Sequence, residues 1–163
     1  MWSGIVKRLE GELLAEKLRG RIGYFCPGFG ENPEEKALVR FDGRELLLGE
    51  YFRYDRLAVI DITRAIYKAG GLTRPEVLNK AMLTALENGV LDSQIVFSAA
   101  HKVINSPIEA SLYGDDPLAR MYALLDRRTG KRRLKQLTGR INGEPEWLQQ
   151  FYLIRLHTEG IKV

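Results

Sequence analysis

The sequence predicts an α+β protein: a small N-terminal three-stranded antiparallel sheet with one helix, followed by an α-helical bundle. Three observations support this fold class. Asp42-Gly43 separates two apolar runs, which is typical of a β-hairpin because a type I′ turn needs positive φ at both central positions. Apolar residues in the first 20 positions recur three and four apart, as on one face of a helix. After residue 50, helix-starting residues and helical apolar spacing recur to the end of the chain.

The N-terminal part is expected to contain one helix over residues 3–20. Ser3 is a suitable N-cap, and Gly20 is expected to end the helix in the left-handed conformation. The helix is expected to cover the sheet, because three strands need a second layer to bury their apolar face. The strands are expected at about residues 21–26, 36–41 and 44–48.

The remaining chain is expected to form helices that begin at recognisable capping signals. Thr73-Arg74-Pro75 predicts a helix with Thr73 as its cap, and Asp116-Pro117 predicts another in the same way. Asp92, Ser106-Pro107 and Pro145 mark three further starts. With 163 residues the chain is expected to be a single domain over 1–163, made of subregions 1–50 and 51–163.

The composition indicates a soluble cytoplasmic protein. Cys26 is the single cysteine, so an internal disulfide is excluded, as is usual in a reducing cytosol. The N-terminal segment is interrupted by charges, which argues against a signal peptide. No stretch approaches the roughly 20 apolar residues that a membrane helix needs, so no membrane partner is expected.

The positive charge is concentrated in one segment. Residues 120–140 carry eight basic side chains and one acidic one, whereas the rest of the chain carries 17 basic and 20 acidic side chains. The sequence therefore describes a mildly acidic protein with one basic segment, an asymmetry that sometimes marks an interaction site. The candidate binding residues, for phosphate or for a protein partner, are Arg127, Arg128, Lys131, Arg132, Arg133 and Lys135.

Three interpretations of this basic cluster are open. In the first it is helix-end chemistry: Arg127 and Arg128 lie in the last turn of the helix that begins at Asp116, with Gly130 left-handed after it. Asp126 is then expected to pair with a neighbouring arginine. In the second the cluster binds a protein partner. In the third it binds nucleic-acid phosphates, with Arg128, Arg132 and Lys135 on one helical face. No aromatic residue is interleaved with the basic ones, so a base-reading element is missing.

Catalytic and cofactor sites are not predicted. Cys26, His101 and His157 are far apart in the sequence and lack the spacing of a zinc site. Ser98 and His101 share a helical face, but a nucleophile also needs an orienting group and an oxyanion site. The loop GFGENP lacks the glycine spacing of a nucleotide-binding loop. We therefore expect no metal, no cofactor and no catalytic residue.

Three segments resemble a group of uncharacterised bacterial proteins. These are MWSGIVKRLEGELLAEKLRGRIGYF, FSAAHKVINSPIEASL and LARMYALLDRRTGKRRL. The resemblance covers about residues 1–137 and implies a bacterial, cytoplasmic, single-domain protein with no assigned activity. It also implies that DRRTGKRRL belongs to the pattern of the group.

The function that the sequence favours is a non-enzymatic protein-interaction domain. The partner is an unknown protein or a second copy of this chain. The sheet edges and the aromatic segment 51–54 can be covered either internally or by a second copy, and the sequence does not decide between the two. The first alternative is a nucleic-acid-associated protein that uses the cluster 127–135, and the second is an enzyme of unidentified class.

Overall fold

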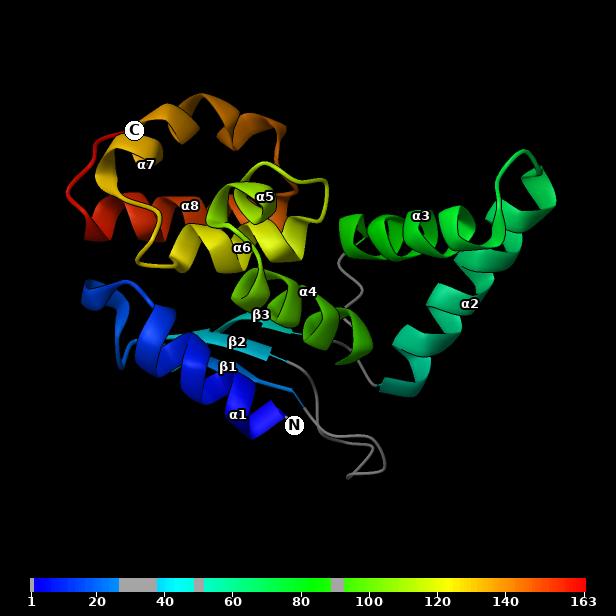
Figure 1. Cartoon of the computed structure of the whole chain (residues 1–163), viewed down its shortest axis with the longest axis horizontal. Helices are drawn as coiled ribbons and strands as arrows, with labels where there is room; N and C mark the ends of the chain where they lie inside the picture. The colour runs from blue at the N-terminus through cyan, green and yellow to red at the C-terminus, as the bar shows by residue number, and fades with distance from the viewer. Residues whose placement is uncertain (1, 27–37, 49–51, 89–92) are drawn as a thin grey trace.

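The structure is a computed structural model that describes residues 2–26, 38–48, 52–88 and 93–163 (Figure 1). It has the expected α+β class: a helical segment, a three-stranded antiparallel sheet and then a series of helices. The predicted loop GFGENP and the predicted cap Asp92 lie outside the described residues.

The sheet confirms the predicted strands and turn. Strands β1 (Ile22–Phe25), β2 (Leu38–Phe41) and β3 (Arg44–Leu48) pair in the order β1-β2-β3, each antiparallel to the next. Asp42 and Gly43 have φ of 48° and 78°, as a type I′ turn requires. Arg21 donates to both carboxylate oxygens of Asp42 at 2.9 and 2.7 Å, which ties the hairpin turn to the start of β1.

The N-terminal helical segment is shorter than predicted. Helix α1 (Trp2–Val6) continues into a π-helical stretch, η1 (Lys7–Leu13), where the predicted helix ends. The chain then becomes extended before a short 3-10 turn, η2 (Glu16–Leu18), and Gly20 adopts the predicted left-handed conformation with φ of 73°. The prediction of one helix to residue 20 is therefore wrong beyond Leu13.

The cause of this break is a pairing with a distant part of the chain. The backbone N–H of Ala15 donates to Leu125 at 2.9 Å, and that of Arg127 donates to Leu13 at 2.7 Å. Leu14 forms an isolated antiparallel bridge with Asp126 between them. Two hydrogen bonds to another segment replace helical ones, so the extended conformation satisfies the same backbone groups.

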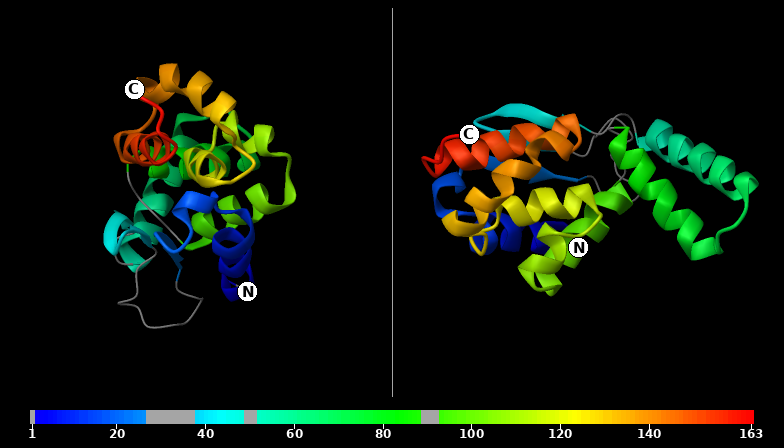
Figure 2. Two further views of the ribbon diagram at one scale, coloured as in Figure 1. Left: turned by 90° about the vertical axis from the view of Figure 1, so that its left-hand side faces the viewer. Right: turned by 90° about the horizontal axis from the view of Figure 1, so that it is seen from above.

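The helices form two groups. Helices α2 (Phe52–Ala69) and α3 (Arg74–Glu87) make a hairpin that stands to one side of the rest (Figures 1 and 2). The other group contains α4 (Ser93–Asn105), α5 (Ile108–Leu112), α6 (Pro117–Leu125), α7 (Lys131–Leu137), the 3-10 helix η3 (Thr138–Gly143) and α8 (Glu146–Thr158). The indole N–H of Trp147 donates to the carbonyl of Leu86 at 3.0 Å and ties the hairpin to α8.

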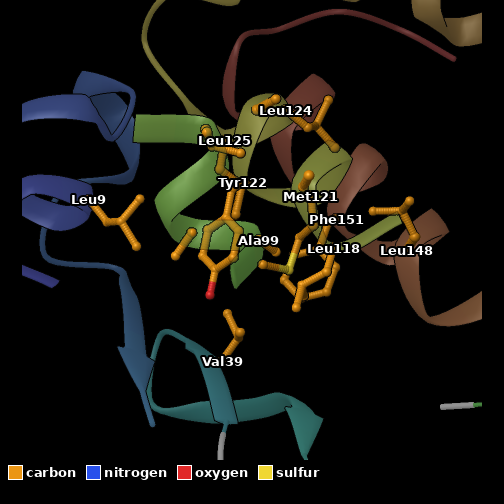
Figure 3. Close-up of a cluster of buried hydrophobic side chains, with 14 of the residues drawn as sticks. Leu9, Val39, Ala99, Leu118, Met121, Tyr122, Leu124, Leu125, Leu148 and Phe151 are labelled. Atoms are coloured by element: carbon orange, nitrogen blue, oxygen red, sulfur yellow. The ribbon is translucent and has the colours of Figure 1, made fainter. Parts of the chain in front are cut away.

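Helix α6 is the centre of the core. All of its residues are buried except Arg120, which is half-buried, and it contacts α3, α4, α5 and α8. Figure 3 shows Tyr122 directed from α6 toward the sheet, beside Val39. The ring of Tyr122 lies 5.1 Å from that of Tyr24 in β1, so the helical group and the sheet share one apolar core.

Candidate functional site

Helix α6 ends before Arg127, three residues earlier than the helix-end interpretation of the basic cluster requires. Helix α6 stops at Leu125, Asp126 is extended with φ of −72° and ψ of 141°, and α7 begins at Lys131. Arg127 and Arg128 are therefore not in the last turn of a helix. Gly130 has φ of −77° and caps the start of α7, so the prediction of a left-handed glycine is also wrong. Residues 125–127 are held extended by their pairing with residues 13–15. This pairing excludes a helical turn at Arg127 and Arg128.

Arg128 is directed inward onto Asp126, as the predicted pairing of this acid requires. Asp126 is 2% exposed, and its carboxylate accepts the Arg128 backbone N–H at 2.7 Å and the guanidinium at 2.8 to 3.1 Å. The guanidinium also donates to the carbonyl of Val103 at 3.0 Å, in the last turn of α4. Hydrogen bonding to Asp126 raises the pKa of Arg128 above its ordinary value. The proposed helical face of Arg128 with Arg132 and Lys135 is thus not formed.

Arg133 is a second member of the cluster that has internal partners. Its guanidinium donates to the carbonyl of Arg128 at 3.1 Å and forms an ion pair with Glu109 of α5. The side chains of Arg133 and Glu109 are 37% and 50% exposed, so this pair lies at the surface and its net stabilisation is small.

Helix α8 holds the loop between α6 and α7 in place. Thr129 is fully buried, and its hydroxyl donates to the carbonyl of Ala123 at 2.7 Å. The guanidinium of Arg155, which is 3% exposed, donates to the carbonyls of Leu124 and Thr129, each at 3.1 Å, and pairs with Glu159. Arg155 is not among the residues predicted from the sequence. The available signal was a basic residue inside the broad apolar face of the last helix.

Four members of the cluster remain exposed to solvent: Arg127, Lys131, Arg132 and Lys135. Lys17 joins them from η2, because Nζ of Lys17 and Nζ of Lys131 lie 3.8 and 4.0 Å from the same Glu159 oxygen. We call these five residues the basic surface. Within the described ranges, the other three members form no ion pair. Their charges are available to a partner.

A second polar feature lies at the opposite end of α6. Arg120 donates to both oxygens of Glu144 at 2.6 to 3.1 Å and to the carbonyl of Gly114 at 2.8 Å. The Tyr152 hydroxyl donates to the same carboxylate at 2.9 Å, and burial, with the nearby Glu144 charge, raises the pKa of Tyr152. Two open hollows of about 370 and 340 Å³ flank the Arg120–Glu144 pair.

The other residues tested for chemistry do not come together. Ser98 and His101 are both exposed on α4, and His101 stacks on Phe97 with ring centroids 6.4 Å apart. Neither residue lines the two hollows. In the described part of the chain, no three His, Cys, Asp or Glu side chains are grouped so as to hold a metal ion.

Comparison with known sequences assigns the chain to a family. The sequence model of the SF0329 protein family matches residues 1–156. The chain belongs to the SF0329 family. This match confirms the resemblance to uncharacterised proteins and extends it through most of α8. Neither the curated proteins nor the solved structures that were compared with this SF0329 family member contain a match. Among its described helices, none combines the length and the apolar character needed to cross a bilayer.

Proposed function

We propose that the protein is a non-enzymatic binding domain whose basic surface docks onto an acidic surface of another protein. The observation that supports this proposal is the division of the basic cluster. Arg128 and Arg133 have internal partners, whereas Arg127, Lys131, Arg132 and Lys135 are exposed. Exposed charges on a fixed backbone steer an oppositely charged partner and raise its association rate.

The backbone under the basic surface is held on two sides. The segment 125–127 is paired with 13–15, and Thr129 is buried between α6 and Arg155. A partner that binds this surface therefore meets side chains whose attachment points are already ordered. This lowers the entropy cost of association.

A protein partner is favoured over nucleic acid because residues 127–135 contain no aromatic side chain. Recognition of single-stranded nucleic acid usually depends on aromatic side chains on which bases stack. The proposal includes a bacterial cytoplasmic setting, supported by the presence of a single cysteine in the sequence and by the resemblance to bacterial proteins.

The test compares two triple charge reversals. Arg127→Glu, Arg132→Glu and Lys135→Glu reverse the basic surface, and Lys68→Glu, Arg74→Glu and Lys80→Glu make the same change on exposed positions of the α2–α3 hairpin. The tagged chain is used to capture partners from its native cells, and the captured protein is purified. Its association with each variant is then measured over a salt series.

We expect the basic-surface variant to lose association with the captured partner and the hairpin variant to keep it. The association rate of the wild-type chain is expected to fall as the salt concentration rises. Equal loss in both variants, or no effect of either, contradicts the proposal. Sedimentation of the purified chain alone identifies the case in which the partner is a second copy.

Nucleic acid is the second candidate partner. Lys17 and Lys131 come from different segments and both lie beside Glu159, so the basic surface extends beyond a single helix. Fluorescence anisotropy with short DNA and RNA tests it. Four phosphate contacts predict a slope of about −3.6 in log affinity against log salt for duplex DNA. Absence of binding at low salt rejects this candidate and leaves the protein-partner proposal standing.

A further inference from the structure

The two hollows beside α6 share part of their lining, and together we call them the polar groove. Both are lined by Asp115, Arg120, Gly143 and Glu144. The hollow of about 370 Å³ extends from these residues to Tyr113 and Arg140, and that of about 340 Å³ extends to Glu87, Pro117 and Pro145. The groove therefore runs from η3, across the Arg120–Glu144 pair, to the C-terminal end of α3.

The charges along this groove are separated by sign. Arg120 and Glu144 neutralise each other through the bidentate pair at 2.6 to 3.1 Å, and their side chains are only 12% and 4% exposed. The remaining charges are Arg140 at one end, Glu87 at the other and Asp115 in the part common to both hollows. Within the described ranges, none of these three forms an ion pair. The groove thus has a cationic end and an anionic end.

The side chain of Arg140 is oriented by the aromatic ring of Tyr113 and not by an acidic side chain. Its guanidinium lies 5.6 Å from the centroid of the Tyr113 ring, a cation–π arrangement that orients it without neutralising its charge. A carboxylate from a ligand is the group that a planar guanidinium binds best, through two parallel hydrogen bonds.

We propose that the groove binds a small dipolar molecule of the amino-acid or short-peptide class. Its carboxylate lies on Arg140, and its ammonium group lies toward Asp115, which lines the same hollow. A plain anion is disfavoured because Asp115 lines the same hollow as Arg140. A water-sized group occupies about 30 Å³, so the larger hollow has room for about a dozen non-hydrogen atoms, the size of a dipeptide. This site is distinct from the basic surface and does not rest on the proposed function.

Glycines keep the groove open. A Cβ on Gly139 or Gly143 would meet no atom within 4 Å, so a side chain at either position projects into free space beside the groove. Neither glycine has a positive φ, so the backbone accepts an L-residue there. Gly143 lines both hollows, and Gly143→Met is therefore a blocking variant that introduces no backbone strain.

The experiment is a nitrogen-15 NMR titration of the full chain with L-alanyl-L-alanine, followed at the amides of Gly114, Gly139 and Gly143. Three further probes are titrated: the N-acetylated dipeptide, the C-terminal amide of the dipeptide and inorganic phosphate. We expect saturable shifts of these glycine amides with the free dipeptide, with a dissociation constant on the order of 1 mM. Each capped dipeptide is expected to bind more weakly than the free dipeptide, by up to about fivefold, the upper end for one exposed ion pair.

Variants assign each end of the ligand. Arg140→Gln is expected to remove the difference between the free dipeptide and its amide. Asp115→Asn is expected to reduce the difference between the free and the acetylated forms. Gly143→Met is expected to abolish the shifts, and Arg132→Gln on the basic surface is expected to leave them unchanged. The dispersion of the spectrum shows in the same experiment that each variant is folded.

Four results overturn the proposal. They are the absence of shifts up to about 10 mM dipeptide, ten times the expected dissociation constant; equal binding of the capped and free forms; shifts with phosphate but not with dipeptide; and shifts confined to amides away from the groove. If Gly143→Met does not fold, Arg140→Gln decides the test, because Arg140 is exposed and, in the described part of the chain, forms no ion pair.

Discussion

The pair between Asp126 and Arg128 is expected to be a stability determinant, and Asp126→Asn tests this with almost no change of shape. Asp126 is 2% exposed, whereas the Arg128 side chain retains 31% of its exposure. Breaking a buried ion pair costs about 3–5 kcal/mol. Because the Arg128 charge can be partly hydrated, we expect the lower end, about 3 kcal/mol. For a chain of this length, this lowers the melting temperature by roughly 6–12 °C.

The measurement is urea and thermal unfolding followed by circular dichroism. The matched control is Arg132→Gln, which removes an exposed charge from the same segment and is expected to change stability by less than about 0.5 kcal/mol. If the two residues act as a unit, the double variant Asp126→Asn with Arg128→Met loses less than the sum of the single variants. If Asp126→Asn is as stable as the control, Arg128 is not anchored as described and its charge returns to the candidate binding set.

Three further changes test other parts of the structure. Glu144→Gln removes the charge from the buried pair with Arg120 and is expected to cost about 3 kcal/mol in urea unfolding, and a wild-type midpoint contradicts the described burial. Gly114→Ala places a Cβ 2.6 Å from a carbonyl oxygen of α5 and is expected to cost about 1–3 kcal/mol in the same assay; no loss shows that the loop can move aside. Burial raises the pKa of both Tyr24 and Tyr122, so above pH 10 only the unfolded state releases these protons. Stability is therefore complete below about pH 10 and falls as pH rises further, by about 1.4 kcal/mol per pH unit for each tyrosine, and a stability that stays constant between pH 10 and 11 contradicts this.

The sheet and most helix starts could be predicted because their signals are local. Asp42-Gly43 determines a turn by the φ values that those two residues accept. Asp116 accepts the backbone N–H groups of Leu118 and Ala119 at 2.9 and 3.1 Å, as its position before Pro117 indicated. Such signals depend on atoms a few residues apart, and a single sequence contains them in full.

The ends of two helical segments could not be predicted because their cause is not local. Residues 13–15 and 125–127 are more than 100 positions apart, and only their pairing explains why one helix stops at Leu13 and another at Leu125. Local propensity favours continuing the first helix, and the two intersegment hydrogen bonds outweigh it. Arg155 escaped prediction for the same reason, since its partners at Leu124 and Thr129 belong to another helix and a loop.

The division of the basic cluster changes how its function should be tested. Composition treats its six residues as equivalent, but Arg128 and Arg133 hold the loop to α4 and α5. Replacing Arg128 is expected to weaken folding and binding together. A loss of binding in that variant therefore does not distinguish a binding role of Arg128 from a structural one. The four outward residues Arg127, Lys131, Arg132 and Lys135 are exposed, and among them only Lys131 forms an ion pair within the described ranges, with Glu159 at 4.0 Å. A salt slope that corresponds to four contacts, and that decreases by about 0.9 with each of these residues removed, would assign nucleic-acid binding to this surface. A slope insensitive to all four would place the phosphate contacts elsewhere on the molecule.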